Sequence, residues 1–386
     1  MLYGIAAATA ALFLTAALAA LLRMFALRFG VAERRRVRVV PLLGGVAVVG
    51  GTAFVARVGD WTGVAPLGPE AGRVLVVGMG VALVGLVADL RAVPFVGRAV
   101  ALVVRALPPA VRTLPLILRV AVVGGGAALV VPYDELGLLG GVLAVAWVVF
   151  VVHAFSSLDH ADGVLGTVGV ITAFALSGCA AAEVMDGLAA LLSVLAAALT
   201  GFLMHGWPPA RIVPGRCGAL FAGFVLASAA VLVHAGREAG AGLGAGFALT
   251  AVACADVLLV LVSRWRGGRP VLRSGPDHLV HRLRRVGVAR QGVMVAIGVA
   301  AFAGALVGLL ISLGWVRAGV AWWVAGAVGL VAVVGGVWPV SRPLRPCPSR
   351  TWGALPPSPP YRAERARPQT PDGLNGYPPR SGASCV

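Results

Sequence analysis

Long apolar segments recur along this chain from its first residues to about residue 340. A helix that crosses the hydrocarbon core of a membrane needs about 20 mostly apolar residues, and eleven segments approach or reach that length. Because only 12% of the residues are charged, against about 25% in soluble domains, a soluble globule is excluded. We therefore predict an all-α, polytopic integral membrane bundle of ten or eleven transmembrane helices. The predicted spans are 2–22, 39–57, the short segment 74–88, 114–132, 137–155, 163–182, 187–205, 217–235, 241–262, 291–313 and 318–340.

The distribution of arginine predicts how the chain lies in the membrane. The 32 basic residues are all Arg, and they exceed the 15 acidic residues by 17. Such an excess is typical of nucleic-acid-binding proteins, but basic residues of membrane proteins gather in cytoplasmic loops, so we expect no nucleic-acid partner. The loops on one side hold only Arg57, Arg73, Arg237 and Arg317, which leaves 28 of the 32 Arg for the other side. We therefore predict a multi-pass protein of the cell (plasma or inner) membrane, with its N-terminus outside and its C-terminus in the cytoplasm.

The segments outside the predicted spans differ in composition. No Arg precedes Arg23, so the first apolar segment lacks the basic start of a signal peptide and is predicted to remain as a span. Residues 97–113 mix Arg with apolar residues and suit an interfacial helix. Residues 341–386 hold 11 of the 25 Pro, so we divide the chain into a membrane domain, 1–340, and a disordered cytoplasmic tail, 341–386. The five Cys have no metal-ligand spacing, which argues against a zinc site.

Acidic and histidine side chains collect where the spans end on the predicted cytoplasmic side. One acid, Asp256, is the exception, because it lies within the ninth span. Carboxylates hold divalent metals, and Arg and His contact phosphate oxygens, so this face suits a substrate that carries a diphosphate. The residues concerned are Asp89, Asp159, Asp162, Asp277, His278 and His281.

Each of these features also has a plainer interpretation. The Asp162–Gly163 pair is equally well placed to cap the sixth span. His278 and His281, taken alone, are ordinary loop residues, and the glycine pairs of the second span are typical of close helix packing. No single residue therefore identifies the chemistry, and the order of the segments has to be considered.

In that order, five segments match the motifs of one enzyme family. They are Pro41–Gly45 (PLLGG), Gly85–Arg91 (GLVADLR), His153–Val164 (HAFSSLDHADGV), Gly201–Phe224 (with PPA at 208–210) and Asp277–Leu283 (DHLVHRL). In this register the chain resembles the polyprenyl-phosphate N-acetylhexosamine-1-phosphate transferases, the MraY/WecA/TagO-like group, over residues 31 to about 300. The PPA segment and the histidine box resemble the WecA/TagO branch more closely than the peptidoglycan-precursor branch.

The resemblance implies an activity and a set of site residues. Members transfer a sugar-1-phosphate from a UDP-N-acetylhexosamine to a polyprenyl phosphate in cell-envelope polysaccharide synthesis, and a magnesium ion (Mg2+) stabilises the charge of the diphosphate. The partners implied are the nucleotide sugar, the lipid carrier held between spans, the bilayer and a second copy of the chain in a homodimer. By the same resemblance, Asp89, Asp159 and Asp162 form the catalytic acidic site, with Asp159 as a metal ligand, and Arg211, His278, His281 and Arg282 contact the substrates.

The chain departs from the family pattern at several site positions. Ala88 replaces one of two paired aspartates, and Arg216 stands where the family has a metal-binding aspartate. A guanidinium cannot coordinate a metal and repels a divalent cation, although it is able to clamp a diphosphate directly. The alternatives are therefore a metal-free mechanism, a catalytically impaired pseudoenzyme that binds the lipid carrier or regulates, and, more distantly, a transporter. The other departures are His153, Ser156, His160, Gly206, Cys217, Ala219 and Val280.

Overall fold

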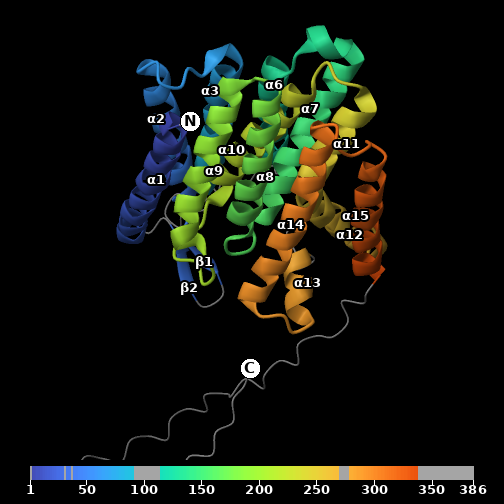
Figure 1. Ribbon diagram of the computed structural model, residues 1–386. Helices are drawn as coiled ribbons and strands as arrows, with labels where there is room; N and C mark the ends of the chain where they lie inside the picture. Colours follow the sequence, from blue (N-terminus) through green and yellow to red (C-terminus); the bar gives the residue numbers. More distant parts are fainter. Residues whose placement is uncertain (1, 30–31, 36–37, 91–113, 269–277, 338–386) are drawn as a thin grey trace, which may run out of the picture. The chain divides into compact units, whose positions relative to one another are not determined.

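The structure is a computed structural model that describes residues 2–29, 32–35, 38–90, 114–268 and 278–337. Within these residues the chain is a bundle of helices (Figure 1). The interfacial segment 97–113, Asp277 and the tail 341–386 lie outside the described residues. The helices are α1 (Leu2–Phe29), α2 (Gly44–Trp61), α3 (Gly68–Leu90), α6 (Leu114–Val130), α7 (Tyr133–Leu158), α8 (Val164–Ala182), α9 (Asp186–Gly206), α10 (Gly215–His234), α11 (Ala239–Leu249), α12 (Ala251–Arg266), α13 (Leu279–Arg285), α14 (Arg290–Ser312) and α15 (Val320–Val337).

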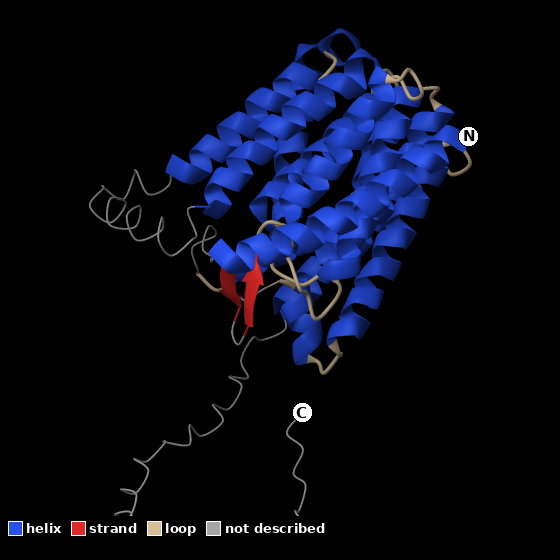
Figure 2. Cartoon of the chain, turned by 90° about the vertical axis from the view of Figure 1, so that its left-hand side faces the viewer, coloured by secondary structure: helices blue, strands red, loops and turns tan. Residues whose placement is uncertain are grey.

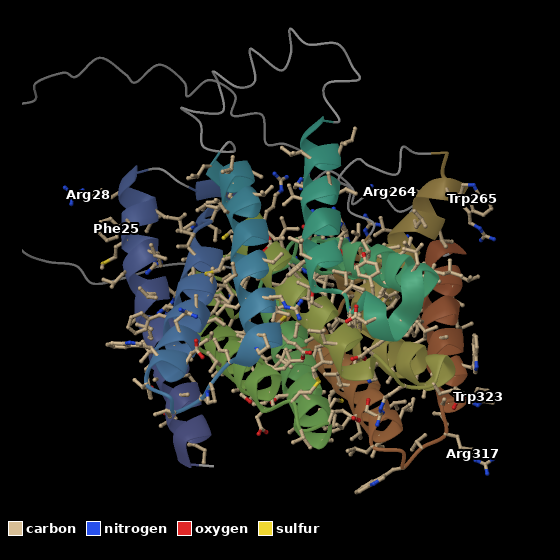
Figure 3. All side chains as sticks on the ribbon, turned by 90° about the horizontal axis from the view of Figure 1, so that it is seen from above. Phe25, Arg28, Arg264, Trp265, Arg317 and Trp323 are labelled. Atoms are coloured by element: carbon tan, nitrogen blue, oxygen red, sulfur yellow. The ribbon has the colours of Figure 1, made fainter. Side chains whose placement is uncertain are left out.

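Every predicted span overlaps one of these helices or a helix pair. Seven described helices are long and apolar enough to cross a membrane, or eight if α11 and α12 form one bent span. The apolar parts of α6 and α15 are shorter. The prediction of a polytopic helical membrane protein is confirmed by the long apolar helices, whereas the count of ten or eleven spans stays a prediction. Large apolar side chains also point outward from the bundle (Figure 3), with Trp323 81% and Trp265 79% exposed. Such a surface suits contact with lipid.

Three details of the predicted spans are wrong. The second span was expected to begin at residue 39, but Arg38–Pro41 is strand β2, paired antiparallel with β1 (Ala32–Arg35) at one end of the bundle (Figure 2). Proline disfavours helix at the residue before it, so the extended chain continues to Pro41. The third span is not short, since α3 has 23 residues. The ninth span is broken, because α11 and α12 meet at an angle of 78°.

Helix α10 forms the centre of the bundle. An apolar 18-residue stretch of this helix is 94% buried, and the helices α3, α7, α2 and α8 pack around it. Glycines let the backbones approach closely, as the sequence predicted for the second span: a Cβ atom on Gly45 would overlap the backbone of Gly218. On α3, a Cβ atom on Gly85 would lie 2.7 Å from Arg216 O. The first turn of α10 is therefore held against both α2 and α3.

We predict that Gly85→Val destabilises the protein by about 1–3 kcal/mol, because the added side chain must displace the backbone of α10. The matched control is Gly80→Val on the same helix, since a Cβ atom at Gly80 meets nothing within 4 Å. Thermal unfolding in detergent compares the two variants with the unmodified chain. Equal unfolding temperatures for the two variants would contradict the packing argument.

Candidate active site

Segments far apart in the sequence meet at one end of the bundle, which we call the site face. The β1–β2 hairpin, the α7–α8 and α9–α10 connections and α13 lie there, at the lower end in Figure 1. Backbone hydrogen bonds join the entry of α2 to the α9–α10 connection: Val213 N–H donates to Pro41 O, and Gly44 N–H donates to Val213 O, both at 3.0 Å. Two of the motif segments are therefore in direct contact.

Asp89 lies in the last turn of α3, and its side chain binds the start of α10. Its side chain is buried, and its two carboxylate oxygens accept the backbone N–H groups of Arg216 (3.1 Å) and Cys217 (3.0 Å). These groups belong to the first turn of α10, where no helical acceptor exists, so Asp89 caps a helix other than its own. Gly215, at φ 64°, makes room, because a Cβ atom there would lie 2.6 Å from Asp89 Oδ2.

Arg119, Arg216 and His153 are basic residues on the helices next to this carboxylate. Arg216 is exposed at the first turn of α10, and the half-buried Arg119 of α6 lies within electrostatic reach of both Arg216 and Asp89. His153 of α7 lies within reach of Arg119 on another side. Its Nδ1–H donates to Val149 O at 2.8 Å, whereas its buried Nε2 has no hydrogen-bond partner among the described residues. Arg119 therefore places a positive charge near Asp89.

The acids of the α7–α8 connection take different places. Asp159 is the C-terminal cap residue of α7, and Asp162 Oδ2 accepts a long hydrogen bond from Ala210 N–H at 3.4 Å. Asp162 therefore faces the α9–α10 connection, where the neighbouring Arg211 is exposed. Gly163 is the cap residue of α8, as the capping interpretation of the Asp162–Gly163 pair allowed, while Asp162 bonds to the α9–α10 connection.

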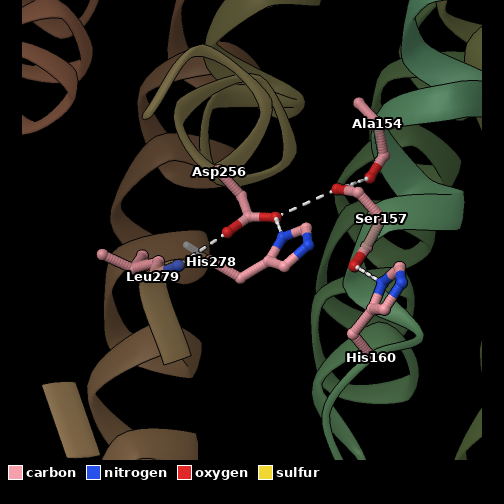
Figure 4. Close-up of polar contacts among 6 residues, drawn as sticks. All are labelled: Ala154, Ser157, His160, Asp256, His278 and Leu279. Atoms are coloured by element: carbon pink, nitrogen blue, oxygen red, sulfur yellow. Dashed lines mark hydrogen bonds and ion pairs between the residues drawn. The ribbon is translucent and has the colours of Figure 1, made fainter. Parts of the chain in front are cut away.

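A second buried acid holds the histidine segment (Figure 4). Asp256 of α12 accepts hydrogen bonds from His278 Nδ1 (2.9 Å), Leu279 N–H (2.9 Å) and Ser157 Oγ (3.0 Å). His278 is buried, and the ring of His160 stacks on it with 4.7 Å between centroids. Because Nδ1–H of His278 donates to the carboxylate, its Nε2 is the atom left to meet a ligand.

The remaining residues of the histidine box lie beside this group. The ring of His281 meets that of His278 edge-on, at 6.5 Å between centroids. Arg282 donates from Nη2 to Ser263 Oγ at 2.7 Å, which ties α13 to α12. The structure therefore brings His278, His281 and Arg282 together on one short helix segment and joins it to α12.

Sequence reasoning missed three contributors to this arrangement. Asp256 stood apart as an acid within a predicted span, but the fold places it under His278. Ser157 and Arg119 were not singled out. A charged side chain inside an apolar segment is costly and marks function, so Asp256 and Arg119 both carried a signal in the sequence, whereas Ser157 carried none.

The described residues do not fit the magnesium ligands that the resemblance implies. No group of three His, Cys, Asp or Glu side chains in the described part of the chain is arranged to hold a metal. Both oxygens of Asp89 already accept backbone N–H groups, and Arg216 occupies the expected ligand position. A guanidinium has no lone pair for a metal and repels a cation beside it.

We predict that Asp89→Ala lowers the stability by about 1–2 kcal/mol, because it leaves two N–H groups of α10 without their acceptor. Asp134→Ala at the exposed start of α7 is the matched control and should change stability by less than about 0.5 kcal/mol. Thermal unfolding in detergent measures both variants. An unfolding temperature for Asp89→Ala equal to that of the unmodified chain would show that the cap is unimportant.

Comparison with known proteins places the chain in a family. The model of glycosyl transferase family 4 matches residues 72–234. A Streptomyces coelicolor protein named "Putative glycosyltransferase SCO3672" is 52% identical over 340 residues, which cover 86% of this chain and 78% of that protein. The decaprenyl-phosphate N-acetylglucosaminephosphotransferase of Mycobacterium tuberculosis is 30% identical over 42% of this chain and 46% of its own length. The phospho-N-acetylmuramoyl-pentapeptide-transferase of Rubrobacter xylanophilus is 26% identical over 68% of this chain and 73% of its own length.

These matches agree with the order of motifs along the sequence. The family model spans the helices from α3 to α10, which carry Asp89, the α7–α8 acids and the α9–α10 connection. The Streptomyces relative extends the similarity over most of the chain. The chain is a membrane protein that belongs to glycosyl transferase family 4.

Proposed function

We propose that the chain transfers N-acetylhexosamine-1-phosphate from a UDP-N-acetylhexosamine to a polyprenyl phosphate, as part of cell-envelope polysaccharide synthesis. The observation that carries the proposal is the convergence of the motif segments on the site face, with His278 held by Asp256 beside the α7–α8 acids. The Mycobacterium and Rubrobacter relatives are named as phosphotransferases, which supports the same class of reaction.

In the reaction, an oxygen of the lipid phosphate attacks the phosphorus that carries the sugar. A new P–O bond forms, and the phosphoanhydride bond to the uridine phosphate breaks, which releases UMP. Both reactants are anionic, so the site must supply positive charge and hold the phosphates in line. We assign this binding role to Arg211, His278, His281 and Arg282, and the acidic role to Asp159 and Asp162, whereas Asp89 fixes the start of α10.

The fold fixes the orientation of the His278 ring. Asp256 accepts the Nδ1–H of His278 and fixes the orientation of the ring, so Nε2 is the ring atom left to meet a phosphate oxygen. Stacking on His160 restricts the ring plane further. Asp256 is therefore a positioning residue in this proposal.

The orientation follows from the same proposal. The site face is assigned to the cytoplasm, because nucleotide sugars are made there and because the Arg-rich loops end there. The N-terminus then lies outside. The cytoplasmic tail and the homodimer remain predictions from the sequence.

A specific observation favours a second candidate, a pseudoenzyme of the same fold that binds the lipid carrier. Ala88 and Arg216 remove two carboxylates of the family pattern, while Asp89 keeps the helix start intact. Such a chain would retain the fold and the lipid site without turnover. The two experiments below separate these candidates.

For the transferase, the purified chain incubated with radiolabelled UDP-N-acetylglucosamine and a polyprenyl phosphate is expected to yield a labelled lipid product. Asp256→Asn should lower its rate about tenfold or more, because the carboxylate that accepts the Nδ1–H of His278 and orients the ring is lost. Asp186→Asn, at the start of α9, serves as the control. Absence of product, beside an active family member assayed in parallel, would refute the transferase.

Restoring the family acids tests the pseudoenzyme. If the chain is impaired, the double variant Ala88→Asp and Arg216→Asp should transfer sugar at least about tenfold faster in magnesium than the unmodified chain. Single-turnover and steady-state rates measure the difference. If the unmodified chain already matches the double variant, the pseudoenzyme is the wrong interpretation.

A further inference from the structure

A groove lies between the first half of α7, the end of α10, α11 and α15, at the end of the bundle away from the site face. Its volume is about 780 Å³, within the range of about 300–1,000 Å³ that is typical of small-molecule sites. The lining is mainly apolar, and its largest side chains are those of Trp147, Phe247 and Trp322. The mouth is apolar as well, because Leu143, Leu243 and Trp322 are exposed.

The wall that α11 contributes is made largely of glycine. Gly240, Gly242, Gly244 and Gly246 all line the groove. Gly246 is buried, yet a Cβ atom there would meet nothing within 4 Å, so the space beside it belongs to the groove. Apolar cavities exclude water and bind apolar ligands. Because the mouth of this groove is apolar and the chain is a membrane protein, the ligand at hand is the hydrocarbon chain of a lipid.

The ionisable side chains of the lining lie at the end of the groove where α7 begins and α10 ends. They are Glu135, His234 and Arg237. Arg237 forms an ion pair with Glu183 and donates from Nη1 to Ser312 O at 2.6 Å. The buried His234 is also held within the protein, with Nε2 2.8 Å from Ser312 Oγ. Glu135 forms no ion pair among the described residues, so it is the charged side chain of the lining that lacks an opposite charge.

We propose that the groove binds a phospholipid with a primary-amine head group, from the leaflet opposite the site face. One acyl chain lies in the groove beside Gly246, and the ammonium group meets the carboxylate of Glu135. An ammonium offers three N–H donors and pairs with a carboxylate, whereas an anionic head group would be repelled there. The proposal goes beyond the transfer reaction and does not depend on it, because the groove lies away from the site face.

The test compares two lipids that differ in the head group alone. The full chain in detergent is titrated with phosphatidylethanolamine and, separately, with phosphatidylglycerol of the same acyl chains, and native mass spectrometry measures the lipid bound. Phosphatidylethanolamine should bind at least about fivefold more tightly, which is what about one unit of charge near a membrane surface contributes. Equal binding of the two lipids, or tighter binding of phosphatidylglycerol, would overturn the proposal.

A variant of the carboxylate assigns the head-group preference. Glu135→Gln should reduce the difference between the two lipids to less than about twofold, because the amide no longer carries the charge. Asp134→Asn is the matched control, since Asp134 is exposed in the same first turn of α7 but does not line the groove, and it should keep the preference. Because Glu135 is exposed, Glu135→Gln should unfold at the same temperature as the unmodified chain. A preference that persists in Glu135→Gln would contradict the assignment.

A second variant tests the place of the acyl chain. Gly246→Leu should weaken the binding of both lipids by about tenfold or more, because the added side chain fills the space beside α11. Gly326→Leu, on the exposed surface of α15 and outside the groove lining, should leave binding unchanged. Thermal unfolding shows whether each variant is folded. Unchanged lipid binding in folded Gly246→Leu would place the lipid elsewhere and overturn the proposal.

Discussion

The site depends on how the first N–H groups of two helices are satisfied. A helix start has backbone donors with no helical acceptor, and burial makes them costly to leave unpaired. In this chain a carboxylate from a different helix accepts them: Asp89 of α3 serves α10, and Asp256 of α12 serves α13. Each bond joins segments that are far apart in the sequence. The same two acids therefore fix the positions of Arg216 and of His278.

This arrangement changes how the acids of the family pattern should be interpreted. Asp89 and Asp256 both direct their oxygens to hydrogen-bond donors of the protein, so their charge is used to order the site. The exposed side chains nearby, Arg211 and Arg216, are positive. Guanidinium and imidazole groups would then bind the proposed anionic substrates, and Asp162 bonds to the α9–α10 connection.

Much of the fold could be predicted because it depends on local properties. The length and composition of each apolar segment determined a helix, and the motif order led to the family. The strand pair before α2, the break near Thr250 and the partnership of Asp256 with His278 could not be predicted in this way, because each depends on packing between distant segments. Arg119 was hidden for the same reason: its neighbours Asp89 and Arg216 come from other helices.

Position 216 separates the requirements of the fold from those of the chemistry. Asp89 bonds to the backbone N–H of Arg216, and the side chain of Arg216 is exposed, so the start of α10 forms equally well with an acid or a base there. The exchange of a carboxylate for a guanidinium therefore costs the fold little while it reverses the charge presented to a substrate. Asp89 has no such freedom, because its side chain makes the bonds. The physical constraints therefore allow position 216 to change while they require a carboxylate at Asp89 to hold the start of α10.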